Sequence, residues 1–177
     1  MFASTDSRPD TTQNSAILEC RRRRVASLGR MAFDFQIVVD SARPHEQADW
    51  WAEALGWTVE ASDEAFIRKM VDEGHATEAE TAVHRGVLVW REGAAILHPD
   101  SAGSDGLRRR VLFQMVPEAK TVKNRVHLDV RVGAENVEAE VGRLVGMGAT
   151  LLHRGRQGPV HTWVTLADPE GNELCLT

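Results

Sequence analysis

The chain carries one hydrophobic pattern twice: an apolar strand, then an amphipathic helix that ends at a glycine. The copies run over residues 35–39, 44–55 and Gly56, and over residues 126–130, 135–147 and Gly148. When Gln36 is aligned with His127, the two glycines fall within one residue of the same position. Such a duplication predicts two similar modules that face each other across one cleft.

Helical spacing of apolar residues places the two main helices. After Pro44 the apolar positions are Ala48, Trp51, Ala52 and Leu55, and the second copy has Val137, Val141, Leu144 and Val145. Both sets fit one buried helix face, and proline and glycine mark the ends of the first helix. Further strands are predicted at residues 57–60, 86–91, 110–116, 149–153, 162–167 and 173–177. Each module therefore reads as strand, helix and three strands.

The first module contains extra chain between its second and third predicted strands. Phe66, Ile67, Met70 and Val71 predict an amphipathic helix there, and a second short helix is expected at residues 76–82. The second module uses only about ten residues for the same connection. We therefore expect residues 61–85 to be an insert that lies over the mouth of the cleft.

Composition is that of a globular protein, with 42% hydrophobic and 27% charged residues in 177. No apolar run approaches the roughly 20 residues that a membrane span needs. The arginines at residues 21–24 are not followed by the apolar segment of a secretory signal. Cys20 and Cys175 are too few for a disulfide framework, so both are expected to be reduced. A cytoplasmic protein without a membrane partner is predicted.

The charge is unevenly distributed along the chain. Residues 1–30 hold six arginines against three acidic residues, so the remainder is acidic, which disfavours nucleic acid as a partner. Residues 1–30 are also rich in Ser, Thr, Asp and Asn, and we predict a disordered extension. Met31 is a candidate native start, which intact mass spectrometry would test. The predicted domain covers residues 31–177, with modules at about 33–117 and 122–177.

Two motifs add a family resemblance to this pattern. They are Trp50-Trp51-x-x-x-Leu55-Gly56-Trp57 and the terminal Asp168-Pro169-Glu170-Gly171-Asn172-Glu173. With the duplication, they resemble the vicinal oxygen chelate superfamily, in particular its glyoxalase-like members, over residues 33–177. The resemblance implies an α+β fold in which two tandem βαβββ modules form an incomplete eight-stranded barrel. It also implies pairing into homodimers and, in the enzymes, a divalent metal ion in the cup.

The resemblance places the family's four metal-ligand positions on Gln36, Gln114, His127 and Cys175. Only His127 is an ordinary ligand, since two positions offer amides and a thiolate favours a softer ion than Mg²⁺ or Mn²⁺. Glu173 lies on the same strand face as Cys175 and is a candidate displaced ligand or general base. This donor set predicts less than one equivalent of bound metal in the purified protein.

Other polar and aromatic residues have two interpretations each. His127 and Asp129 share a strand face and are either a metal ligand with its carboxylate or a polar pair in a metal-free pocket. Cys175 is either a reactive or an inert buried thiol. Trp90 and Trp163 are expected in corresponding strands, either as walls for a planar ligand or as packing beneath the helices. His161 either contacts substrate or is exposed at the cleft edge.

Two functions remain open from the sequence. The first is a metal-dependent lyase, isomerase or dioxygenase acting on a small oxygenated molecule. The alternative is a metal-free protein that sequesters a small molecule, as bleomycin-resistance members of the superfamily do. No phosphate-binding glycine loop or dinucleotide fingerprint is present, because the glycines of Gly146-x-Gly148 end a helix and do not open one.

Overall fold

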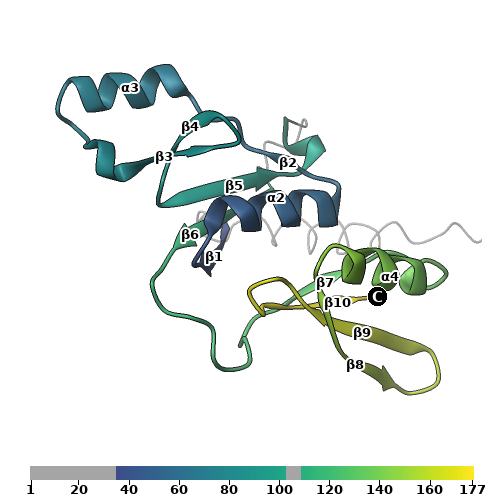
Figure 1. Ribbon diagram of the computed structural model, residues 1–177. Helices are drawn as coiled ribbons and strands as arrows, with labels where there is room; N and C mark the ends of the chain where they lie inside the picture. The colour runs from purple at the N-terminus through teal and green to yellow at the C-terminus, as the bar shows by residue number, and fades with distance from the viewer. Residues whose placement is uncertain (1–34, 103–108) are drawn as a thin grey trace, which may run out of the picture. The chain divides into compact units, whose positions relative to one another are not determined.

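A computed structural model describes residues 35–102 and 109–177 (Figure 1). This part of the chain forms two four-stranded sheets, a two-stranded hairpin and three α-helices. The predicted extension at residues 1–30 and the candidate start at Met31 lie outside the described residues. Among the helices described, none has both the length and the apolar character needed to cross a membrane.

The two four-stranded sheets have the same connectivity. The first has the order β1-β6-β5-β2, and its strands are β1 (Ile37–Ser41), β2 (Thr58–Val59), β5 (Gly93–Leu97) and β6 (Arg110–Met115). The second has the order β7-β10-β9-β8, and its strands are β7 (Leu128–Val130), β8 (Thr150–Gln157), β9 (His161–Ala167) and β10 (Glu173–Leu176). In each sheet the first strand pairs in parallel with the last, and the other pairs are antiparallel. The predicted α+β fold of two βαβββ units without a closed barrel is confirmed.

Each sheet carries one helix on one face. Helix α2 (Pro44–Leu55) has the predicted bounds, because Pro44 presets the first helical φ angle and Gly56 ends the helix at a φ of 65°. Helix α4 (Val137–Gly146) packs against β8, β9 and β10, whereas α2 packs against β5 and β6. The opposite face of each sheet is the cup face, which carries Gln36 and Val38 in the first sheet and His127 and Asp129 in the second.

The insert of the first module departs from the prediction. It contains α3 (Glu64–Asp72), the 3₁₀ turn η2 (Glu78–Glu80) and a hairpin of β3 (Thr81–His84) and β4 (Val87–Trp90); a further 3₁₀ turn, η3 (Pro99–Ala102), follows β5. The strand predicted at residues 86–91 is part of this hairpin, and the third strand of the core sheet is β5, which the sequence pattern missed. The expectation that Trp90 and Trp163 occupy corresponding strands was therefore wrong.

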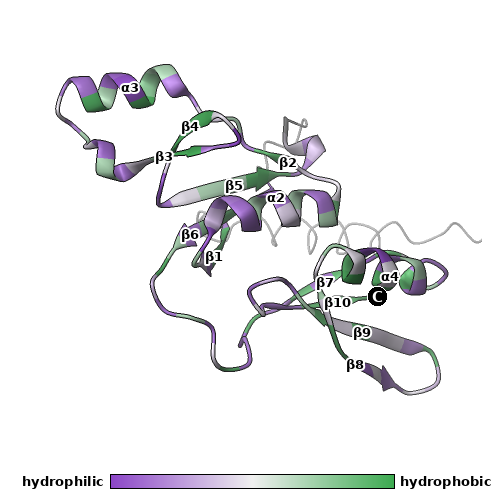
Figure 2. Cartoon of the chain, viewed as in Figure 1, coloured by the Kyte–Doolittle hydropathy of each residue, from purple (hydrophilic) through white to green (hydrophobic). Residues whose placement is uncertain are grey.

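Helix α3 is amphipathic, as its alternating hydropathy in Figure 2 shows. The Asp63 carboxylate accepts a hydrogen bond from the backbone N–H of Phe66 and caps the helix. Ile67 is buried, while Phe66 stays half exposed. Helix α3 packs against β4 of the hairpin. The insert as a lid over the cup stays a prediction.

One hydrophobic core joins the two modules. Trp50 and Trp51 of α2 belong to the same buried cluster as Val141 and Leu144 of α4. Full burial of a large aliphatic or aromatic side chain stabilises the fold by about 1.5–3 kcal/mol relative to exposure. The largest fully buried hydrophobic side chains are Phe113, Ile67, Ile96, Leu144, Leu166, Leu174 and Leu176.

Module 2 also binds both ends of α2 through polar side chains. Arg43, the N-cap residue, makes no side-chain capping bond, and the Glu170 carboxylate accepts from the backbone N–H groups of Ala42 and Arg43 instead. At the other end, Arg143 of α4 donates to the carbonyl oxygen of Ala54 at 2.8 Å. An anion at the N-terminus and a cation at the C-terminus both complement the helix dipole.

The middle of α2 is held by a buried carboxylate. Oδ2 of Asp168 accepts from Gln47 Nε2 at 3.1 Å and from Trp51 Nε1 at 2.9 Å. Its Oδ1 accepts from the backbone N–H groups of Glu170 and Asn172 and thereby shapes the turn between β9 and β10. We call Asp168, Glu170 and Arg143 the clasp, because together they attach α2 to module 2.

Candidate functional site

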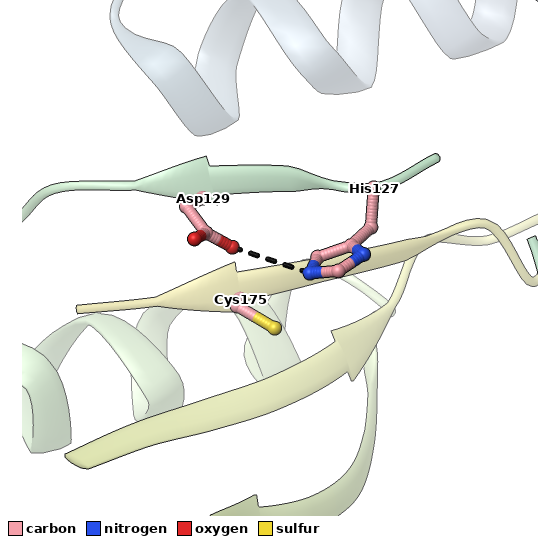
Figure 3. A group of neighbouring side chains, drawn as sticks. All are labelled: His127, Asp129 and Cys175. Carbon is pink, nitrogen blue, oxygen red and sulfur yellow. Dashed lines mark ion pairs between the residues drawn. The ribbon is translucent and has the colours of Figure 1, made fainter. Parts of the chain in front are cut away.

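Three potential metal ligands converge on the cup face of module 2. His127 lies just before β7, Asp129 lies within β7, and Cys175 lies opposite Asp129 on β10. One ligand atom from each lies within 4.8 Å of the others, and Nε2 of His127 is 3.4 Å from Oδ1 of Asp129 (Figure 3). His127 and Asp129 are exposed, whereas Cys175 is 6% exposed. The predicted shared face of His127 and Asp129 is confirmed.

The arrangement of the three side chains is that of a common ion-binding position and differs from that of a nucleophilic relay. In a Cys-His-Asp relay, one imidazole nitrogen faces the thiol and the other faces the carboxylate. Here the Asp129 oxygen meets Nε2 of His127, and Figure 3 shows the Cys175 sulfur on that same side of the ring. Because one nitrogen faces both partners, the three side chains point toward a common position where an ion could bind.

A row of polar side chains continues from Cys175 across the sheet. Oγ1 of Thr165, on β9, is 3.3 Å from Sγ of Cys175 and 3.2 Å from Nε2 of His153, on β8. A β-bulge at Leu152 shifts the ladder so that His153 lies opposite Thr165. Sequence reasoning missed Thr165 and His153, because the bulge gives no signal in the hydrophobic pattern.

Glu173 faces a different set of groups. Its carboxylate accepts from the backbone N–H of Asn124 at 2.9 Å and from Lys120 Nζ at 3.2 Å. Burial raises the pKa of Glu173, but these two donors outweigh it, so the pKa lies below its ordinary value. Lys120 and Glu173 thus form a partly buried ion pair that holds the segment before β7. The role of Glu173 as ligand or base stays a prediction.

At the equivalent place in module 1, a guanidinium group is present where module 2 has its three potential metal ligands. Arg110 of β6 donates to the Gln36 amide oxygen at 2.9 Å and to Glu60 Oε2 at 2.9 and 2.7 Å. The Gln36 oxygen is therefore already hydrogen-bonded to a cation.

Gln114 belongs to a different residue pair of the parallel ladder between β1 and β6. It pairs with Asp40, four residues beyond Gln36 on β1, which corresponds to about 13 Å along the strand. The residue of β6 that corresponds to Cys175 is Leu112, because Val38 pairs with Leu112 as Asp129 pairs with Cys175. The structure therefore brings together His127 and Cys175 but not Gln36 and Gln114.

The two tryptophans that were candidates for ligand contact, Trp90 and Trp163, lie in different parts of the fold. Trp163 is partly exposed on the cup face of β9, and the His161 ring lies beside it with a centroid separation of 5.5 Å. Trp90 lies in the separate hairpin, where its carbonyl oxygen is 2.9 Å from Nε2 of His45.

A cavity of about 830 Å³ lies next to the His127 side of this face. It is lined by β1, by the segment from Glu118 to Leu128, and by the turn residues Glu170 and Asn172. Its volume is within the range of small-molecule pockets, and its lining mixes apolar side chains with a few charged ones.

The profile of a protein family described as "Glyoxalase-like domain" matches residues 36–177. The chain belongs to this family. Among curated protein sequences, none matches the chain. The sequence resemblance to glyoxalase-like proteins of the vicinal oxygen chelate superfamily is thereby confirmed.

Solved structures share the fold of this glyoxalase-like domain at low sequence identity. The fosfomycin resistance protein FosX from Mesorhizobium loti is 8% identical, with a TM-score of 0.52 over 82% of this chain and 90% of the other. A variant of FosX from Listeria monocytogenes, complexed with Mn(II) and 1S,2S-dihydroxypropylphosphonic acid, is 9% identical, with a TM-score of 0.53 over 82% and 89%. At such identities the likeness establishes the fold alone.

The metal ion of the superfamily can be tested against these residues. Tetrahedral Zn²⁺ at about 2.0–2.3 Å from each ligand places neighbouring ligand atoms roughly 3.5 Å apart. The 3.4 Å between His127 and Asp129 already has this value, and the Cys175 sulfur needs only a small approach. The set of imidazole, carboxylate and thiolate suits a borderline ion such as Zn²⁺ better than Mn²⁺ or Mg²⁺. The inherited set with Gln36 and Gln114 does not fit.

Proposed function

We propose that this glyoxalase-like domain binds a small oxygen-bearing molecule on the cup face of module 2. The observation that carries the proposal is the convergence of His127, Asp129 and Cys175 within 4.8 Å on an accessible sheet face. The cavity beside the cluster supports it, because His127 lines this cavity and its volume suits a small molecule. The complex of FosX with a small phosphonic acid shows that a protein of this fold can hold such a ligand.

We further propose that the three residues hold one borderline divalent ion, with a free position for the ligand. Such an ion would act as a Lewis acid on a ligand oxygen, which is the chemistry a lyase, isomerase or dioxygenase needs. His127 would bind through Nε2, Asp129 through a carboxylate oxygen and Cys175 through its deprotonated sulfur. Because two of the three ligands are exposed, we expect weak retention, so that the purified protein carries less than one equivalent.

Metal-free binding is the second candidate, and Arg110 favours it. The guanidinium at Gln36 places a permanent positive charge in the half of the site where the superfamily's enzymes place metal ligands. A protein of this kind would sequester its ligand through hydrogen bonds and aromatic contacts, with His127 and Asp129 as a polar pair.

Cobalt titration separates the two candidates. The chain is purified without a metal-binding tag, treated with a chelator and titrated with Co²⁺, whose sulfur-to-metal charge-transfer absorption reports thiolate ligation. We expect this band to saturate near one equivalent and to disappear in Cys175→Ser and His127→Ala. Asp40→Asn, an exposed carboxylate on the cup face of β1, is the matched control and should leave the band unchanged. No band in the parent protein would contradict the metal centre and leave the metal-free candidate.

We also propose that the protein is a homodimer, as the superfamily resemblance implies. Exposed apolar side chains at Val38, Leu151 and Leu152 support it, since pairing would cover them. Light scattering at micromolar concentration should give a mass well above the 19.6 kDa of one chain. A cytoplasmic location stays a prediction from the sequence.

A further inference from the structure

The Trp163 indole lies flat over a glycine in the neighbouring strand. Gly155 of β8 pairs with Trp163 of β9, and a Cβ atom at Gly155 would lie 2.2–2.5 Å from three atoms of the indole. Real Cβ atoms essentially never show such contacts, so only glycine leaves room for the ring in this position. Trp163 nevertheless stays partly exposed, and the His161 ring lies beside it. We call Trp163 on Gly155 the indole shelf.

The indole shelf and the polar row share one sheet face. Paired residues of an antiparallel ladder point to the same side, so His153 and Gly155 share the cup face with Thr165 and Trp163. Thr165 follows Trp163 by two residues, about 7 Å along the strand, and Cys175 lies opposite Thr165 on the next strand, about 4.8 Å away. One small molecule can therefore cover the shelf and reach the three converging ligands.

The charges on this face define the ligand further. The arginines of β8 pair with Val164 and Thr162 and so belong to the opposite face, where Arg154 binds Glu138 of α4. The cup-face neighbours of the shelf are Gln157, His161 and His153. None of these three described residues carries a permanent positive charge, so the β8 and β9 side of the shelf offers nothing specific to a phosphate or carboxylate.

We propose that the site takes a planar aromatic molecule that carries an oxygen substituent. The ring stacks on Trp163, and the substituent points along β9 toward Thr165 and Cys175. Gly155 is then a specificity-determining residue, since it allows the indole to lie flat. The proposal rests on the proposed function for the polar end of the ligand, whereas stacking on the shelf needs no metal ion.

The test compares 2-naphthol with its saturated counterpart decahydro-2-naphthol, by isothermal titration and by NMR of the tryptophan indole N–H groups. We expect the planar probe to bind roughly tenfold more tightly and to shift the Trp163 signal, because stacking adds to the buried area. Gly155→Ala should remove most of this preference. The control Gly142→Ala, where a new Cβ meets nothing within 4 Å, should keep it. Trp163→Leu provides a second variant if Gly155→Ala does not fold.

Each outcome decides the proposal. Equal binding of the two probes, or an unchanged preference in both Gly155→Ala and Trp163→Leu, would overturn it. Repeating the titration with a chelator separates it from the metal proposal. A planar preference that survives the chelator, in a protein that shows no cobalt band, would support the shelf while the metal centre fails. Loss of the preference in the shelf variants with an intact cobalt band supports both.

Discussion

Asp168→Asn tests whether the clasp stabilises the domain. Asp168 is 3% exposed, and both of its oxygens only accept hydrogen bonds: two from backbone N–H groups at Oδ1, and three from Gln47, Trp51 and Asn172 at Oδ2. Asparagine has the same shape but carries one NH₂ group. If the NH₂ group takes the place of Oδ1 it faces two donors, and if it takes the place of Oδ2 it faces three. Rotating the amide by 180° therefore cannot restore the lost hydrogen bonds.

The expected cost follows from those lost bonds. A buried donor left without its acceptor costs about 1–3 kcal/mol, so two of them give about 4 kcal/mol. For a chain of this size each kcal/mol lowers the melting temperature by about 2–4 °C, which predicts a decrease of about 8–16 °C. The exposed control Asp40→Asn should stay within about 0.5 kcal/mol of the parent.

Urea unfolding with a double-mutant cycle is the decisive assay. Trp51→Phe removes the indole donor, and because it shares a bond with Asp168, the free-energy changes of the two substitutions should not add. We expect the double variant to be more stable than the sum by about 1 kcal/mol. Simple additivity, or an Asp168→Asn variant that melts within about 3 °C of the parent, would refute the assigned role of this carboxylate.

Three smaller predictions accompany it. Glu170→Gln keeps an acceptor at the N-terminus of α2 but removes the charge, so it should lower stability by less than about 1 kcal/mol, and less still at high salt, in thermal unfolding. Elemental analysis of untagged protein should find less than one divalent ion per chain; a full equivalent that His127→Ala removes would contradict this. The backbone N–H and hydroxyl of Thr77 lower the pKa of Glu80. That capping contribution is present above the ordinary glutamate pKa and is lost as the pH falls through the lowered one, which an NMR titration of the Thr77 amide would follow.

The repeated strand-helix-glycine pattern predicted the modules because helix and strand periodicity are local properties. Helix α2 was predicted with its observed bounds, since Pro44 and Gly56 act on their own backbone angles. Strand β5 was missed because its sequence, Gly-Ala-Ala-Ile-Leu, begins with residues of low strand propensity. The more apolar Val87–Trp90 was taken as the core strand, although it belongs to the hairpin.

The candidate site was only partly predictable, because strand register is not local. The sequence placed His127 and Asp129 on one face from their spacing alone, and it named Cys175 through the family resemblance. It could not show that Arg110 binds Gln36, since the two residues are 74 positions apart and meet only through the pairing of β1 with β6. Nor could it show that Asp168 and Glu170, which lie in the turn between β9 and β10, bind α2 of the other module.

Comparison of equivalent strand positions in the two modules explains why any metal ion would bind to module 2. Where module 2 has His127, Asp129 and Cys175, module 1 has Gln36, Val38 and Leu112. Two of these three positions are apolar and supply no ligand, and the third is hydrogen-bonded to Arg110, whose own charge is balanced by Glu60. A metal ion at this position would lie beside the permanent positive charge of Arg110, and this like-charge repulsion makes binding there unfavourable. The duplication has therefore produced one half with an internal ion pair and one half with three converging side chains, and we expect any metal ion to bind to the second half.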